Sequence, residues 1–172
     1  MEKLFIVAGR TQAGKTAVIG LLQSLCAVLR IPLIVVTKGV AESIDLHKKL
    51  LEYTRGTEME REHVQVATNK ADGHGRMVKD MLIERCFEGG KHGGCLVIAD
   101  SIPQACKAMK YLEEYQRCGP GGAGRRKFML LIDESDAMRR TQSKTQAFER
   151  TLQRLESLGP CLTTMISGEL SY

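Results

Sequence analysis

Short, mainly apolar runs recur along the chain of 172 residues and are separated by longer mixed segments. A strand with one face in water would alternate apolar and polar residues, so continuous apolar runs indicate strands buried on both faces of a sheet. The pattern predicts six such strands, at residues 4–8, 33–37, 64–68, 96–99, 128–132 and 162–166.

The segments between the runs have the spacing of amphipathic helices. One of them carries Leu46, Leu50 and Tyr53 on a single stripe and stops at Gly56. Strands and helices therefore alternate, which is typical of a parallel sheet covered on both faces. We expect an α/β fold, a three-layer sandwich with a mostly parallel sheet of about six strands. The predicted helices are residues 16–30, 43–55, 76–87, 104–117 and 144–157.

The length of the chain favours a single domain over residues 1–172. Hydrophobic residues make up 43% and charged residues 26%, which suits a globular core and excludes a disordered, collagen-like or coiled-coil chain. The stretch 118–127, CGPGGAGRRK, contains too much glycine for a helix or strand, so it predicts a flexible surface loop.

Charge and aromatic content restrict the partners. The net charge of +5 mildly favours phosphate-rich or nucleic-acid partners. Trp is absent and aromatic residues make up only 5%, which argues against a base-stacking platform. Any contact with nucleic acid is therefore expected to be with its backbone.

The cysteines and the apolar runs bear on the compartment. Six cysteines occur without a C-x-x-C pair, which predicts a reducing, intracellular location in cytoplasm or nucleus. Cys86, His92 and Cys95 fall short of the four ligands of a structural zinc site. No apolar run approaches the roughly 20 residues of a membrane span, so we expect no membrane partner.

A phosphate-binding motif follows the first predicted strand. It matches G-x-x-x-x-G-K-[ST] at every fixed position, between a strand and a helix. The glycines allow backbone N–H groups to surround phosphates, and the helix directs its positive end at them. Lys15 is expected to reach the β- and γ-phosphates, and Thr16 to bind Mg²⁺. The predicted nucleotide-binding residues are Gly9, Arg10, Thr11, Gln12, Ala13, Gly14, Lys15 and Thr16.

An acidic pair ends the fifth predicted strand. A phosphate loop needs a carboxylate at a neighbouring strand end to hold the metal, and Asp133 supplies one. Glu134 is the candidate for polarising an attacking water. A kinase needs no water activator there, so the pair favours hydrolysis of a nucleoside triphosphate such as ATP.

With these motifs in this order, the chain resembles the first RecA-like lobe of superfamily-two DExD/H-box helicases and translocases. GRTQAGKT is similar to their motif I, and the residues from Asp133 to Asp136, DESD, are similar to motif II. The resemblance implies a P-loop NTPase that binds ATP with Mg²⁺ and forms the N-terminal lobe of a longer protein. A second lobe or a neighbouring subunit would then supply an arginine, and the isolated domain would be weakly active.

Three further segments stand where this family couples ATP to nucleic acid. In the family, motifs Ia and Ib contact the nucleic-acid backbone; the residues placed like them are Thr37, Lys38, Gly39, Asp100 and Ser101. Ser167 stands where the family has Ser-Ala-Thr, a coupling motif. In RecA-like folds the strand before it lies between the P-loop strand and the Asp-Glu strand. Thr163 and Thr164 are the alternative polar tip if the register differs.

Two other functions remain open from the sequence. A nucleoside kinase of the thymidine-kinase type also has a P-loop and an Ile-Asp-Glu strand, but it would bring a cysteine-rich zinc lobe and a substrate lasso. A nucleotide-gated binding module would use ATP to order a basic face for a partner without significant turnover. Hydrolysis distinguishes the module from the ATPase.

Overall fold

The computed structural model describes residues 4–8, 14–57, 64–67, 94–117, 126–133 and 142–167. The strands of this part are β1 Leu4–Ala8, β2 Leu33–Thr37, β3 Val64–Ala67, β4 Cys95–Ala99, β5 Met129–Asp133 and β6 Leu162–Ser167. Its helices are α1 Lys15–Val28, α2 Val40–Thr54, α4 Ile102–Arg117 and α6 Gln142–Glu156.

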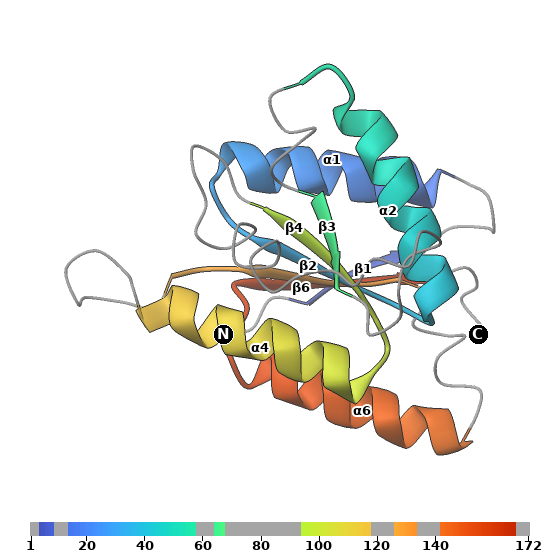
Figure 1. Cartoon of the computed structure of the whole chain (residues 1–172), viewed down its shortest axis with the longest axis vertical. Helices are drawn as coiled ribbons and strands as arrows, with labels where there is room; N and C mark the ends of the chain where they lie inside the picture. The colour runs from blue at the N-terminus through green and yellow to red at the C-terminus, as the bar shows by residue number, and fades with distance from the viewer. Residues whose placement is uncertain are drawn as a thin grey trace.

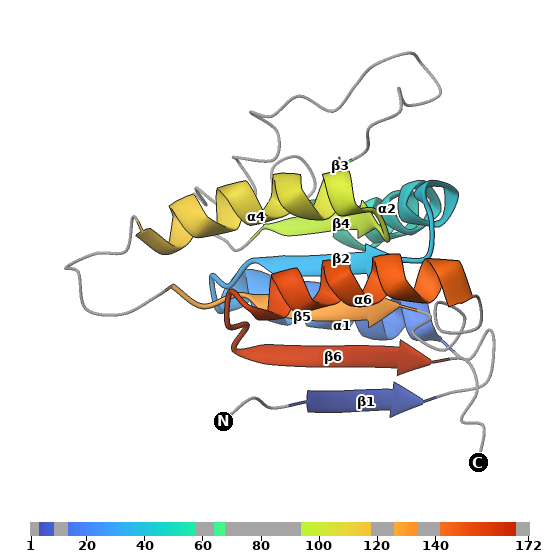
Figure 2. The same ribbon diagram turned by 90° about the horizontal axis from the view of Figure 1, so that it is seen from below.

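The strands form one six-stranded sheet in the order β1-β6-β5-β2-β4-β3, and every described pairing is parallel. The labelled arrowheads therefore point to the same side of the sheet in Figure 2. Strand β6, the last in the chain, lies between β1, the first, and β5. The carboxyl ends of strands distant in sequence are thus brought to one edge.

Helices cover both faces of the sheet, α1 and α2 on one face and α4 and α6 on the other (Figure 1). Alternate residues of the central strands enter two separate cores. On β2, Leu33 and Val35 pack beneath α1 and α2, whereas Ile34 and Val36 pack beneath α4 and α6. All of these strand residues are almost fully buried. The two cores confirm the expected three-layer α/β architecture.

The ends of the helices follow from local backbone chemistry. Helix α4 begins at Ile102, before the predicted start, because Pro103 falls in its first turn, where the missing N–H costs no helical bond. Helix α1 ends at Val28, and Arg30 follows with a φ of 56°. The N–H groups of Arg30 and Ile31 donate to carbonyl groups of the last helical turn, as in a Schellman motif.

Most predicted elements are found within one or two residues of their predicted ends. The predicted stripe of α2 needs a correction, because Leu46 and Leu50 are buried but Tyr53 is 55% exposed. The predicted helix 76–87 and most of the predicted loop 118–127 lie outside the described residues. Among the described residues no two cysteines form a disulfide, and Cys95 is buried in β4.

One buried polar side chain of α1 has a predictable effect on stability. Gln23 is 3% exposed, and neither polar atom of its amide has a hydrogen-bond partner in the described structure. A buried amide without a partner costs about 1–3 kcal/mol. We therefore expect Gln23→Met, which keeps the length of the side chain, to stabilise the fold by about 1 kcal/mol.

Thermal unfolding would measure this effect. About 1 kcal/mol corresponds to a rise of about 2–4 °C in Tm for a chain of this size. The matched control is Gln153→Met, at an exposed position of α6, and should leave Tm unchanged. A lower Tm for Gln23→Met than for the wild type would show that the amide has a stabilising partner.

Candidate functional site

The N-terminal end of α1 is open to an anion. Gly14 precedes the helix with φ 80° and ψ 17°, a left-handed conformation that glycine adopts without strain. Among the described residues no side chain caps this end by a hydrogen bond, and the first turn contains no acidic residue. The partial positive charge of the helix end is therefore not offset by a side chain of that turn.

The surroundings of the glycine-rich motif agree with the predicted order of strand, loop and helix. Strand β1 ends at Ala8, directly before the motif, and α1 begins at Lys15. Gly14, Lys15 and Thr16 are described, whereas the predicted binding residues from Gly9 to Ala13 lie outside the described residues. The path of the loop around a phosphate group is thus a prediction of the sequence.

Asp133 lies at the carboxyl end of β5, as the sequence predicts. The backbone of Asp133 pairs with Ile166 of β6. Because β6 lies between β5 and β1, Asp133 is two strands away from the strand that leads into the glycine-rich motif. The side chain is partly buried. Glu134, the predicted water activator, lies outside the described residues.

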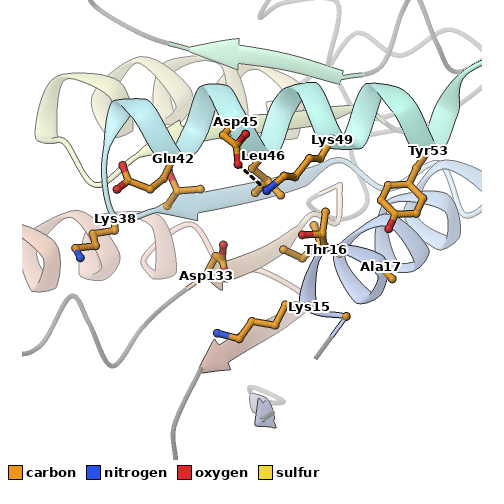
Figure 3. Close-up of a pocket in the computed structure, with 13 residues that line it drawn as sticks. Lys15, Thr16, Ala17, Lys38, Glu42, Asp45, Leu46, Lys49, Tyr53 and Asp133 are labelled. Atoms are coloured by element: carbon orange, nitrogen blue, oxygen red, sulfur yellow. Dashed lines mark ion pairs between the residues drawn. The ribbon is translucent and has the colours of Figure 1, made fainter. Parts of the chain in front are cut away.

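A cavity of about 400 Å³ opens where these elements meet. Helix α1, the end of β2, helix α2 and Asp133 of β5 form its walls, and Figure 3 shows their side chains directed into a common space. Lys15 and Asp133 are 118 residues apart in sequence, yet both contribute to it. Its lining consists of Gly14, Lys15, Thr16, Ala17, Ile19, Thr37, Lys38, Glu42, Asp45, Leu46, Lys49, Tyr53 and Asp133.

The charges of the lining are balanced in number, with three lysines and three carboxylates. One pair is joined directly, because Nζ of Lys49 lies 2.7 Å from Oδ2 of Asp45. The hydrogen bond and then the charge of Asp45 raise the pKa of Lys49, and the charge of Asp133 acts in the same direction. Lys49 is therefore kept as an ammonium group by acids on two elements of the cavity.

The segments predicted to contact nucleic acid lie together at the same edge of the sheet. The backbone N–H of Asp100 donates to the carbonyl of Thr37 over 2.7 Å, which joins the ends of β4 and β2. The hydroxyl of Thr37 is buried, 3.0 Å from the carbonyl oxygen of Gly39 and 3.3 Å from that of Ile98. This hydroxyl therefore serves the local fold. Thr37 and Lys38 line the cavity, whereas Gly39, Asp100 and Ser101 do not.

Ser167 ends β6 beside Ala8 of β1, and one residue beyond the level of Asp133. Its backbone thus lies between the strand that leads into the glycine-rich motif and the strand that carries the aspartate. Thr164 pairs with Leu131, so its backbone lies about 10 Å below the end of the strand at the usual rise per residue. The register places Ser167 at the strand tip, and Thr163 and Thr164 within the sheet.

The donors at the cavity suit a magnesium ion. Mg²⁺ takes oxygen ligands and is commonly held by one or two carboxylates together with phosphate oxygens and water. The cavity offers the hydroxyl of Thr16 and the carboxylate of Asp133. Within the described residues there is no cluster of three or more His, Cys, Asp or Glu side chains for a metal held by protein alone.

Four lining residues of α2 were not predicted from the sequence: Glu42, Asp45, Lys49 and Tyr53. They recur at intervals of three, four and four residues, so helical spacing was the available signal. Tyr53 also explains a glycine within α1, because a Cβ atom at Gly20 would lie 3.2 Å from Cγ of its ring. The glycine therefore allows the ring on α2 to pack closely against α1 beside the cavity.

Together these features define a parallel α/β protein with a charged cavity at the carboxyl edge of its sheet. No protein-family model matches the chain, and no curated protein matches it. Among the described helices, none combines the length and the apolar content needed to cross a bilayer.

Proposed function

We propose that this protein binds ATP with Mg²⁺ and hydrolyses it, as a RecA-like P-loop NTPase domain. The observation that carries the proposal is the convergence of three predicted residues on one cavity. Lys15, Thr16 and Asp133 line it, at a helix end that carries no side-chain cap and no acidic residue in its first turn. A magnesium–triphosphate complex requires a cation and backbone N–H groups to bind the phosphate oxygens, and a hydroxyl and a carboxylate to bind the metal.

Each residue has a role in this proposal. The backbone N–H groups of the motif and the ammonium group of Lys15 bind the phosphates, while Thr16 and Asp133 hold Mg²⁺. The metal, when bound, offsets charge on the phosphate oxygens. Glu134 orients the attacking water and accepts its proton, and Ser167 couples hydrolysis to a conformational response.

We further propose that the domain acts as a helicase-like lobe coupled to nucleic acid. The position of β6 between β1 and β5 supports a RecA-like arrangement. The neighbouring ends of β2 and β4 would contact a nucleic-acid backbone through Lys38, Gly39, Asp100 and Ser101, while the buried Thr37 would hold these two ends together. A second RecA-like lobe or a neighbouring subunit would supply an arginine to the site.

Phosphate release with and without single-stranded RNA or DNA tests both parts of the proposal. We expect slow release from Mg-ATP alone and a severalfold rise when the polymer is added at low salt. The rise should fall steeply between about 50 and 200 mM salt, because binding to phosphates releases counterions.

The outcomes distinguish the parts. Release without stimulation at low salt would remove the nucleic-acid role and leave the ATPase. Nucleotide binding without release would favour the nucleotide-gated module. Absence of nucleotide binding would contradict the proposed function as a whole.

A further inference from the structure

Lys38 lies beside the carboxylate proposed to hold the metal. Strand β2 is the direct neighbour of β5, and Val36 pairs with Ile132. Thr37 is therefore level with Asp133, and Lys38 is one residue further out along the same edge of the sheet. Lys38, Asp133 and Lys15 line the same cavity, and in Figure 3 Lys38 lies next to Glu42 while Lys15 lies on the other side of Asp133.

The ammonium group of Lys38 is available to a ligand. The side chain is exposed and forms no ion pair with another described residue, whereas Lys49 of the same cavity is paired with Asp45. The nearest acid in sequence, Glu42, turns back over the start of α2: its Oε2 lies 2.6 Å from the position of a Cβ at Gly39. Lys49 is thus neutralised by its own helix, whereas Lys38 is not.

The triphosphate requires more positive charge than Lys15 supplies. A triphosphate bears about four negative charges at neutral pH, and Mg²⁺ offsets two of them. The attack of water spreads further charge over the γ-phosphate oxygens, which P-loop enzymes commonly meet with an added cation. Among the described residues, the second cation of this cavity without an ion-pair partner is Lys38.

We propose that Lys38 binds the γ-phosphate and stabilises the transition state of hydrolysis. This inference rests on the proposed ATPase function. Lys38 of this chain would supply a positive charge like the one expected from an arginine of a second lobe. In the reaction, the water oxygen bonds to the γ-phosphorus while the bond to the β–γ bridging oxygen breaks. The electron pair leaves with ADP, the proton of the water passes to Glu134, and the Lys38 ammonium offsets charge on the γ-phosphate oxygens.

The surroundings of Lys38 favour one terminal phosphate over a polymer backbone. Glu42 and Asp45 line the same cavity on α2, so a nucleic acid entering it would bring successive phosphates close to two carboxylates. A single γ-phosphate near Asp133 would meet less repulsion, because Thr16 and Asp133 would hold a magnesium ion that offsets its charge. The alternative role of Lys38 as a contact to nucleic acid is a separate outcome of the test.

The test compares Lys38→Ala with Lys38→Arg and with Lys48→Ala. Lys48 is the matched control, because it is an exposed lysine of α2 that does not line the cavity. Calorimetry gives the affinities for Mg-ADP and for the Mg complex of a non-hydrolysable ATP analogue. Phosphate release from Mg-ATP gives turnover, and binding of single-stranded RNA and DNA is measured at low salt.

We expect Lys38→Ala to leave the Kd for ADP unchanged within about twofold and to weaken binding of the analogue about tenfold, because only the analogue has a γ-phosphate. Turnover should fall about 100-fold, as for the loss of one preorganised donor to a transition state. Lys38→Arg should recover most of the loss, and Lys48→Ala should resemble the wild type.

In each protein, the Kd for the ATP analogue is divided by the Kd for ADP. If this ratio is the same in Lys38→Ala as in the wild type, the inference is overturned, whether or not turnover is measurable. Loss of nucleic-acid binding with unchanged nucleotide affinities would assign Lys38 to the polymer and also overturn it. A wild-type chain that binds neither nucleotide would refute the proposed function itself. An affinity for Mg-ATP that is the same in Lys15→Ala as in the wild type would contradict the proposed phosphate site.

Discussion

Lys15→Ala is expected to raise the Kd for Mg-ATP at least about 100-fold. Lys15 opens α1 and lines the cavity beside Thr16 and Asp133. A hydrogen bond to a charged group contributes about 1.5–3 kcal/mol, and the lysine is expected to make more than one to the β- and γ-phosphates. Because 1.4 kcal/mol corresponds to a factor of ten, the loss of two such bonds exceeds a hundredfold. Titration calorimetry with Mg-ATP and Mg-ADP measures the change.

The variant should fold, since alanine favours the first turn of a helix at least as well as lysine. Thermal unfolding of the variant would verify this, and Lys48→Ala removes the same charge away from the cavity as a control. Equal affinity for Mg-ATP in the wild type and Lys15→Ala would mean that the glycine-rich motif does not bind phosphate in the way proposed.

Glu134→Gln is expected to slow phosphate release about 1000-fold while the Kd for ATP stays within about threefold of the wild type. Removal of a general base costs about 10²–10⁴ in rate, whereas an amide of the same shape leaves the phosphate contacts in place. The variant should therefore retain ATP bound and intact. Single-turnover phosphate release, together with the nucleotide recovered from the filtered protein, measures both effects.

The matched control is Glu149→Gln, at an exposed position of α6 on the opposite face of the sheet, and it should leave turnover unchanged. Turnover that persists in Glu134→Gln would remove this residue from the catalytic assignment. A wild-type protein that binds ATP without turnover, and a variant indistinguishable from it, would instead support the nucleotide-gated module.

The variants at Lys15, Lys38 and Glu134 separate three contributions to the proposed reaction. Lys15 is expected to act on the affinity for both nucleotides, and Lys38 on the difference between triphosphate and diphosphate. Glu134 is expected to act on the rate alone. Three distinct patterns are harder to produce by general destabilisation than one common loss, so the set also guards against an effect of misfolding.

Local patterns were sufficient for most elements and for part of the site. The mainly apolar runs predicted all six strands, because strands buried on both faces of a sheet can carry few polar residues. The pattern predicted a helix from Thr16, one residue after the observed start at Lys15, and the acidic pair predicted a carboxylate at the end of β5. Helix starts were less accurate, as at Pro103, because a first turn depends on backbone bonds that side-chain spacing does not reveal.

The order of the strands and the composition of the cavity depended on contacts distant in sequence. Apolar runs indicate that strands are buried, but they do not say which strand lies beside which; the structure sets β6 between β1 and β5. Helical spacing placed Tyr53 with two core leucines, whereas packing against Gly20 leaves its ring half exposed at the cavity. Lys38 shares a cavity with Lys15 and Asp133 only because β2 pairs with β5. Whether a segment is buried can be predicted from its own residues. A site at the edge of a sheet, in contrast, depends on which strands pair, and these strands are far apart in the sequence.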